Sequence, residues 1–181
     1  MEFLSLLWLP ILISGVVLFI ASSVAWTMMP HHKTDWKKTN NEDELMSAIG
    51  KFNMPAGSYM FPFMTHGKES KGEACMEKYV KGPRGLLILW DMPSMGANMF
   101  FTFLYFLATA TIIAYVSHAA LGNGKEFMKV FQVVGTIGML TYSCAGIPHA
   151  IWFKRRVITD IMDGIVYGVL IGLVFALRWP A

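Results

Sequence analysis

The sequence predicts an all-α membrane protein, a bundle of four transmembrane helices with a small, mostly helical cytoplasmic cap between the first and second helices. Of its 181 residues, 55% are hydrophobic and only 15% are charged, whereas charged residues make up about a quarter of a soluble domain. Four apolar runs reach the roughly 20 residues that a helix needs to cross hydrocarbon. We therefore expect residues 1–181 to form a single integral membrane domain.

The four predicted spans cover residues 3–28, 97–121, 127–153 and 157–179, approximately, and residues 29–96 form the extramembrane cap. Tryptophans stand near the ends of these runs, where an indole ring can lie at the depth of the headgroups. The first run carries Glu2 and no basic residue before a long apolar stretch. A secretory signal peptide has a basic n-region and a shorter apolar core, so we expect a retained span.

The distribution of basic residues predicts the orientation. Twelve of the fifteen Lys and Arg residues lie in the loop after the first span or in the Lys154–Arg156 turn before the fourth. Loops rich in Lys and Arg stay on the cytoplasmic side. The large loop is therefore predicted to be cytoplasmic and both termini periplasmic.

The sequence of the cap predicts four short elements. "NNEDELMSAIG" (40–50) has a capping Asn, acidic residues in its first turn and a terminal Gly, which is typical of a short helix. "MPAGSYMFPF" (54–63) is extended or turning, and "KESKGEACMEKYVKGP" (68–83) predicts a second helix that Gly82-Pro83 ends. "RGLLILW" (84–90) is predicted as a strand or an interfacial stretch.

Small residues predict where the helices pack. Gly164, Gly168 and Gly172 recur every four residues on the fourth span, a spacing that lets a neighbouring backbone approach closely. We expect a stripe of small and polar residues on the third span to face protein, because polar groups lack hydrogen-bond partners in lipid. The stripe consists of Gln132, Gly135, Met139, Tyr142, Gly146 and His149. Whether the partner of the glycine stripe lies in the same chain stays open.

Ionisable residues gather at the predicted cytoplasmic boundary and suggest a metal site. His31 and His32 follow the first span, His149 ends the third, and Asp160 and Asp163 begin the fourth. Neutral imidazoles with carboxylates suit Zn, Fe, Mn or Cu(II), and no thiolate is present to favour softer ions. A divalent transition metal is the candidate cofactor.

A purely structural interpretation competes with the metal site. Asp160 and Asp163 stand in the first turns of a helix, where exposed N–H groups favour carboxylates. Arg156 precedes Asp160 by one helical turn and is a ready ion-pair partner. His31 and His32 then serve as hydrated residues at headgroup depth.

The sequence lacks the motifs of common enzyme classes. It contains no nucleophile elbow, phosphate loop, HExxH helix or dinucleotide fingerprint, so no catalytic residue is predicted and a non-enzymatic role is favoured. The net charge is +3, but acidic residues interleave with the basic ones, which excludes the dense basic face of a nucleic-acid-binding protein.

The segment "HHKTDWKKTNNEDELMSAIGKFNMPAGSYMFP" resembles an uncharacterised family of small bacterial four-span inner-membrane proteins with an HKxD segment after the first span. The resemblance continues through "KGPRG", "MPSMGANM" and "DGIVYGVLIGLVFALRWP". It implies a bacterial inner-membrane location and places several residues at positions of the family pattern: His32, Lys33, Asp35, Asp43, Tyr59 and Asp163-Gly164. It implies no activity, ligand or partner.

Three functional hypotheses follow. The first is a non-catalytic subunit in the lipid bilayer that assembles with itself or with other membrane protein subunits through helix packing and its cytoplasmic cap. The alternative is a metal- or redox-dependent membrane protein with a His/Asp site at the cytoplasmic interface. Transport along the polar stripes is the third, and the lack of ionisable residues near mid-membrane weighs against it.

Overall fold

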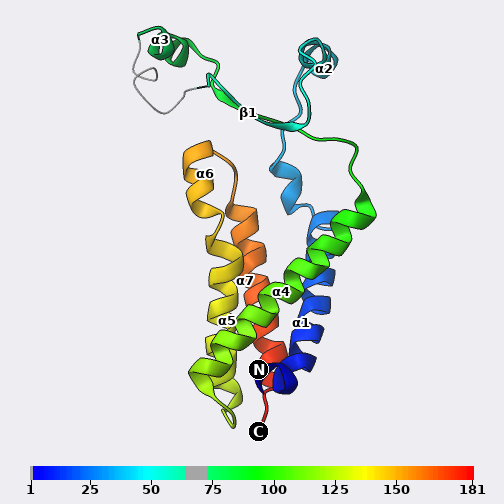
Figure 1. The fold of residues 1–181 in the computed structure, drawn as a ribbon, viewed down its shortest axis with the longest axis vertical. Coiled ribbons are helices and arrows are strands. Elements are labelled where there is room, and N and C mark those ends of the chain that lie inside the picture. The colour runs from blue at the N-terminus through cyan, green and yellow to red at the C-terminus, as the bar shows by residue number, and fades with distance from the viewer. Residues whose placement is uncertain (1, 64–72) are drawn as a thin grey trace. The chain divides into compact units, whose positions relative to one another are not determined.

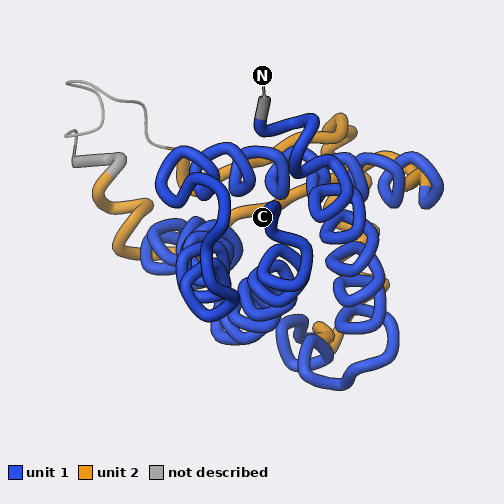
Figure 2. Tube along the Cα trace, turned by 90° about the horizontal axis from the view of Figure 1, so that it is seen from below, with its two compact units in different colours: residues 1–37, 95–181 blue, residues 38–94 orange. Residues whose placement is uncertain are grey.

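A computed structural model of the chain describes residues 2–63 and 73–181. Four helices in these ranges are long and apolar enough to cross a membrane, namely Phe3–Thr27, Met95–Leu121, Phe127–Phe153 and Ile158–Leu177. They confirm the predicted all-α four-helix membrane bundle. The chain divides into two compact units, Met1–Lys37 with Met95–Ala181 and Lys38–Ser94 (Figure 2).

The bundle pairs its helices in a definite order. Helix α1 (Glu2–Thr27) packs along α4 (Met95–Leu121), and α5 (Phe127–Met139) packs along α7 (Ile158–Leu177), which also touches α1. In Figure 1, α4 runs obliquely across the bundle from the end of α1 toward the start of α5. The start of α1 and the end of α7 lie at the same end of the bundle (Figure 1).

The third span is not one regular helix. A π-helical segment, η3 (Leu140–Cys144), follows α5, and a new helix, α6 (Ile147–Phe153), carries Pro148 in its first turn. Proline has no N–H to donate and clashes with the carbonyl of the preceding turn. The interruption therefore lies in the turn before Pro148. Lys154 then ends α6 in the left-handed region, with a φ of 55°.

The glycine stripe of α7 faces α5 and η3 of the same chain. A Cβ atom on Gly168 would lie 2.6 Å from the backbone nitrogen of Met139, and one on Gly164 would lie 2.6 Å from the carbonyl carbon of Tyr142. A Cβ on Gly172 would lie 3.0 Å from the Cα of Gly135. Only glycine permits this approach, because real Cβ atoms essentially never come closer than 3.0 Å.

The packed face of the third span includes part of the predicted polar stripe: Gly135 is buried, Met139 lies against Gly168, and the Tyr142 hydroxyl bonds Thr109. Val130, Val134 and Gly138 are buried there, whereas Gln132 and His149 are exposed. Gly146 does not join the α5–α7 contact. Its nearest neighbour in other parts of the described chain is the Val157 side chain, 3.6 Å from an ideal Cβ position.

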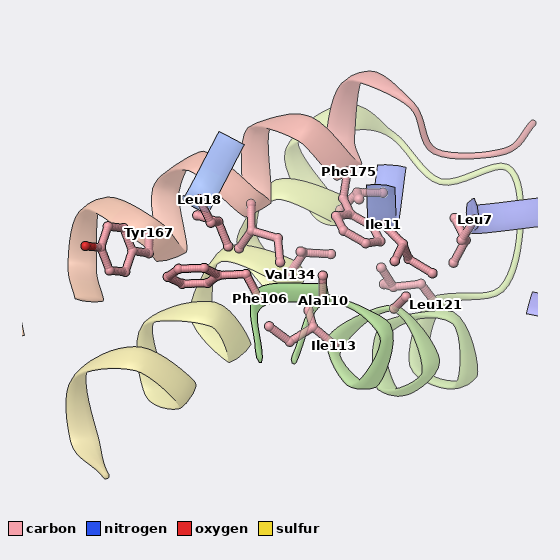
Figure 3. Packing of buried hydrophobic residues seen from close by; sticks show 13 residues of the cluster. Leu7, Ile11, Leu18, Phe106, Ala110, Ile113, Leu121, Val134, Tyr167 and Phe175 are labelled. Carbon is pink, nitrogen blue, oxygen red and sulfur yellow. The ribbon is translucent and has the colours of Figure 1, made fainter. Parts of the chain in front are cut away.

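The hydrophobic core joins residues from all four spans. Leu7, Leu18, Ile113 and Phe175 are almost completely buried in it. Figure 3 shows side chains from α1, α4, α5 and α7 interdigitating there, with Tyr167 at one end of the cluster. Burial of each such side chain contributes about 1.5–3 kcal/mol relative to exposure in water, and less where lipid is the alternative.

The second unit contains helices α2 (Glu42–Gly50) and α3 (Glu73–Lys81) and strands β1 (Gly57–Phe61) and β2 (Gly85–Leu89). The strands pair antiparallel, with Gly57 opposite Leu89 and Phe61 opposite Gly85. The short helix over 40–50 and the strand over 84–90 are thereby confirmed. Part of the helix predicted over 68–83 lies outside the described residues. None of the residues in 38–63 and 76–94 is buried.

Candidate functional site

Two consecutive histidines meet one aspartate from the far end of the chain. A short 3-10 helix, η1 (His31–Thr34), follows α1 after Pro30 and turns both imidazoles toward the first turns of α7. The Nε2 of His31 lies 2.9 Å from Oδ1 of Asp163, and the Nε2 of His32 lies 3.0 Å from Oδ2 of the same carboxylate. One carboxylate therefore serves two imidazoles.

The second nitrogen of His32 is held by another carboxylate. Its Nδ1 lies 2.7 Å from Oδ2 of Asp35, which also accepts a hydrogen bond of 2.8 Å from the Thr159 hydroxyl. In metal sites a carboxylate on the far ring nitrogen fixes the tautomer and the orientation of the ligating histidine. Asp35 and Thr159 hold His32 in this way.

The surroundings exclude water from His32 in particular. Its side chain is 5% exposed, and its ring stacks on the Trp26 indole with centroids 3.9 Å apart and an angle of 11°. The side chains of His31 and Asp163 are 20% and 13% exposed. The Tyr167 hydroxyl, one turn after Asp163, donates to its Oδ2 at 3.3 Å. The site is therefore largely shielded but reachable through His31.

The arrangement satisfies the elementary requirements of a metal centre. The ligand atoms of His31, His32 and Asp163 all lie within 4.8 Å of one another. Two imidazoles and one carboxylate form the ligand set of facial-triad iron sites and of some catalytic zinc sites, which keep further positions open. Without a metal, the same groups form a hydrogen-bonded cluster that ties η1 to α7.

The structure separates the other two predicted ligands from this cluster. Asp160 forms an ion pair with Arg155, so the expected pairing with Arg156 is wrong. Arg156 instead donates to the backbone carbonyl of Thr34. His149 is exposed on α6, and its ring lies against Phe153 with centroids 4.6 Å apart.

Four residues of the site were not among the candidate ligands predicted from the sequence: Trp26, Asp35, Thr159 and Tyr167. The His32–Asp35 spacing of three residues was a usable signal, because on a tight helical turn such residues face the same way. Tyr167 follows Asp163 by four residues, which is also one helical turn. Nothing in the sequence indicates that Thr159 reaches Asp35.

The two carboxylates change the titration of His32. Burial lowers the pKa of His32, but hydrogen bonds to Asp163 and Asp35 outweigh burial and raise that pKa above its ordinary value of 6.5. The hydrogen bond from His32 lowers the pKa of Asp35 below its ordinary value of 3.8, with Thr159 acting in the same direction. The raised pKa of His32 and the lowered pKa of Asp35 both mean that the folded, metal-free protein favours a protonated His32 between ionised carboxylates.

We therefore expect the melting temperature of metal-free protein to decrease as the pH is raised from about 6 into the alkaline range. The contribution of His32 is complete below its unfolded pKa and is lost as the pH rises through its raised folded pKa. The contribution of Asp35 is present above its unfolded pKa and is lost only as the pH falls through its lowered folded pKa. Melting curves in a chelator across this range measure the effect, and His32→Gln should flatten the profile. An equally steep profile in His32→Gln would assign the effect to other groups.

Comparison of the chain with protein-family models, with curated proteins and with solved structures found no match. The site is therefore interpreted from its own geometry.

Proposed function

We propose that this chain is an integral membrane protein that binds a divalent transition metal through His31, His32 and Asp163. The observation that carries the proposal is the position of His32, whose Nε2 points to the Asp163 carboxylate while Asp35 holds its Nδ1. A ligating histidine needs such a partner on its far nitrogen. The distribution of basic residues favours the cytoplasmic face of a bacterial inner membrane as the location of the site.

The donor set favours particular ions. Imidazole suits Zn, Cu, Fe and Ni, whereas Mg and Ca prefer sites built wholly of oxygens. With three protein ligands, the metal keeps positions for water or for an exchangeable ligand, which gives the site a metal-dependent or redox role rather than a closed structural one. Because the imidazoles must be deprotonated on Nε2, the affinity for metal should increase as the pH rises.

The expected result is on the order of one metal ion per chain in protein purified without chelator. Elemental analysis after growth with Zn, Mn or Fe measures the content. Asp163→Asn and His32→Gln should lose nearly all of it because each removes a ligand, and Asp35→Asn should weaken binding by about 10-fold to 100-fold as a lost outer partner does.

His149→Ala is the matched control, since His149 is an exposed histidine of the same bundle outside the cluster. It should keep the full metal content. Wild-type protein without stoichiometric metal after reconstitution, or a loss in His149→Ala equal to that in His32→Gln, would overturn the proposal.

A second candidate function is a subunit that assembles with itself or with a larger membrane complex, and the cap favours it. Large apolar side chains are exposed on this unit, including Phe52 at 71%, Val80 at 71% and Met92 at 94%. Isolated exposed apolar residues are ordinary, but a unit without a buried core needs another surface to stabilise it. In this proposal a partner subunit or a second copy supplies that surface.

The mass of the intact detergent-extracted assembly, with its constituents identified, tests the second candidate. We expect a mass above that of one 20.3 kDa chain, contributed by further copies or by a co-purifying subunit. Phe52→Ser combined with Val80→Ser should shift the assembly toward the single chain if the cap is the contact. A single chain in native extracts without any partner would contradict assembly and leave the metal proposal intact.

A further inference from the structure

A pocket of about 210 Å³ lies beside the histidine cluster, between α1, α4, η3 and the first turns of α7. Its lining comes wholly from the bundle unit. An engineered apolar cavity of about 150 Å³ holds a benzene molecule, so this pocket has room for one ring with small substituents. The π-helical segment η3 contributes Tyr142 and Ser143 to the wall, and π-helical turns are frequent at functional sites.

Aromatic residues supply five of the ten residues that line the pocket. Tyr142 lies 6.0 Å from Phe106 and 5.9 Å from Tyr167, and Phe106 lies 5.8 Å from Tyr167, measured between ring centroids. Tyr105 adds an edge-to-face contact with Tyr142 at 6.4 Å, and Trp26 also lines the pocket. Edges and faces of such rings pack well against a planar ring.

The ionised groups of the lining are already compensated. Asp160 is paired with Arg155, and Asp163 is shared by the two histidines. A ligand with a net charge would therefore find no opposite charge left free in the lining, and burying an unpaired charge is costly. The pocket favours a neutral ligand.

Two groups of the lining retain donors for a ligand. The Tyr142 hydroxyl is engaged with Thr109 at 2.8 Å, and the Tyr167 hydroxyl with Asp163. The Tyr105 hydroxyl has no hydrogen-bond partner among the described residues, and Arg155 uses one of its several N–H groups on Asp160. A ligand that carries acceptor oxygens, such as ring carbonyls, matches this set.

We propose that this pocket binds the ring of a quinone. A quinone ring is planar and neutral and carries carbonyl acceptors, and quinones with an apolar chain partition into lipid bilayers. The Tyr105 side chain is 49% exposed on α4, so the pocket wall reaches the outer surface of the bundle, where a lipid tail can lie. The inference is independent of the metal proposal, although Asp163 lines the pocket as well.

The probe is a benzoquinone with a decyl chain, titrated into the full chain in detergent with chelator present, and binding is measured by equilibrium dialysis against empty micelles. Two comparison compounds separate the sources of affinity. The same quinone without its chain represents a water-soluble ligand, and decylbenzene has the ring without carbonyls. We expect saturable binding of the decyl quinone and at least about tenfold weaker binding of decylbenzene, since the lost carbonyls leave donors unpaired.

Gly146→Leu adds a side chain to the wall of the pocket and tests its volume. Gly146 lines it and has helical backbone angles, and its Cβ would meet only Val157 at an ordinary contact distance of 3.6 Å. Quinone affinity should fall by about tenfold or more, because the added side chain occupies the ring's volume. The matched control is Gly96→Leu, whose Cβ would have no described neighbour within 4 Å and which should bind as wild type does.

Tyr105→Phe is the second variant, and it removes one hydroxyl without filling space. It should weaken quinone binding by about 3-fold to 10-fold, the value of one hydrogen bond, and leave decylbenzene unaffected. Gly146→Leu should retain metal, and His32→Gln should lose nearly all metal but bind quinone, so the two proposals fail separately. Absence of saturable quinone binding by wild-type protein, equal binding of quinone and decylbenzene, or undiminished quinone binding in both pocket variants would overturn the inference. Tighter binding of the quinone without its chain than with it would assign the site to a water-soluble ligand and overturn the membrane source.

Discussion

Gly168→Ala should strongly destabilise the bundle, because the added methyl group meets the backbone of α5. The new Cβ would lie 2.6 Å from the backbone nitrogen of Met139 and 2.9 Å from the carbonyl oxygen of Gly135. Backbone atoms cannot rotate away as a flexible side chain can, so α5 and α7 must separate along their closest contact. Overpacking of this kind lowers the free energy of unfolding by about 1–3 kcal/mol. Because the clash is with backbone atoms, we expect a loss at the upper end of this range for Gly168→Ala. Thermal unfolding in detergent measures the loss.

Two glycine positions serve as controls for Gly168. Gly96→Ala adds a methyl group to a helix with no described neighbour within 4 Å of the Cβ, and Gly146→Ala meets Val157 at 3.6 Å. Gly96→Ala should be neutral or slightly stabilising, since alanine favours helix over glycine by about 1 kcal/mol. Gly146→Ala, at the N-cap of α6, should have only a small effect. A melting temperature in Gly168→Ala equal to that in Gly96→Ala would mean that α5 and α7 are not in contact along this face.

His32→Ala should be the most damaging substitution at the η1 end of the bundle. It removes the group that binds Asp35 and Asp163 at 2.7 and 3.0 Å and leaves two shielded carboxylates without that partner. Breaking a buried charge pair by deleting one member costs about 3–5 kcal/mol. The variant also loses the stacking contact with Trp26. Unfolding of metal-free protein at about pH 6, where His32 is charged, measures the effect at its largest.

His149→Ala is the counterpart of this substitution, because it removes an exposed imidazole from the same bundle. Its effect should stay within about 0.5 kcal/mol. His32→Gln should recover part of the loss, since an amide can still bond one of the carboxylates. If His149→Ala and His32→Ala destabilise the protein equally, the cluster does not hold η1 against α7.

The spans were predictable because the signal is local. The predicted ranges 97–121 and 127–153 differ by at most two residues from the helices Met95–Leu121 and Phe127–Phe153. Hydrocarbon thickness sets the length, and the chain shows it as an uninterrupted apolar run. A proline at position 148, inside the apolar run, is also a local signal for an interruption in the third span. It did not indicate that the interruption takes a π-helical form.

The site was predictable in part, and Asp163 and His149 show the difference. Both residues stand at the predicted end of a span. Their predicted depth in the membrane was therefore compatible with a ligand role for either. Only Asp163 faces the histidines, whereas His149 follows the π-helical segment and Pro148 on α6 and is exposed there. A helix turns by about 100° per residue, and a local irregularity of one residue therefore moves a side chain to another face.

By itself, the sequence determined the membrane class, the approximate limits of the four spans and the gathering of ionisable residues at one boundary. These properties depend on transfer of each segment from water to lipid, which composition alone sets. Only the tertiary structure decided that the glycine stripe is used within the chain, that Asp35 and Asp163 hold His32, and that aromatic rings enclose a pocket beside them. Those features join residues up to 132 positions apart, and their contacts depend on the rotation and tilt of whole helices against one another.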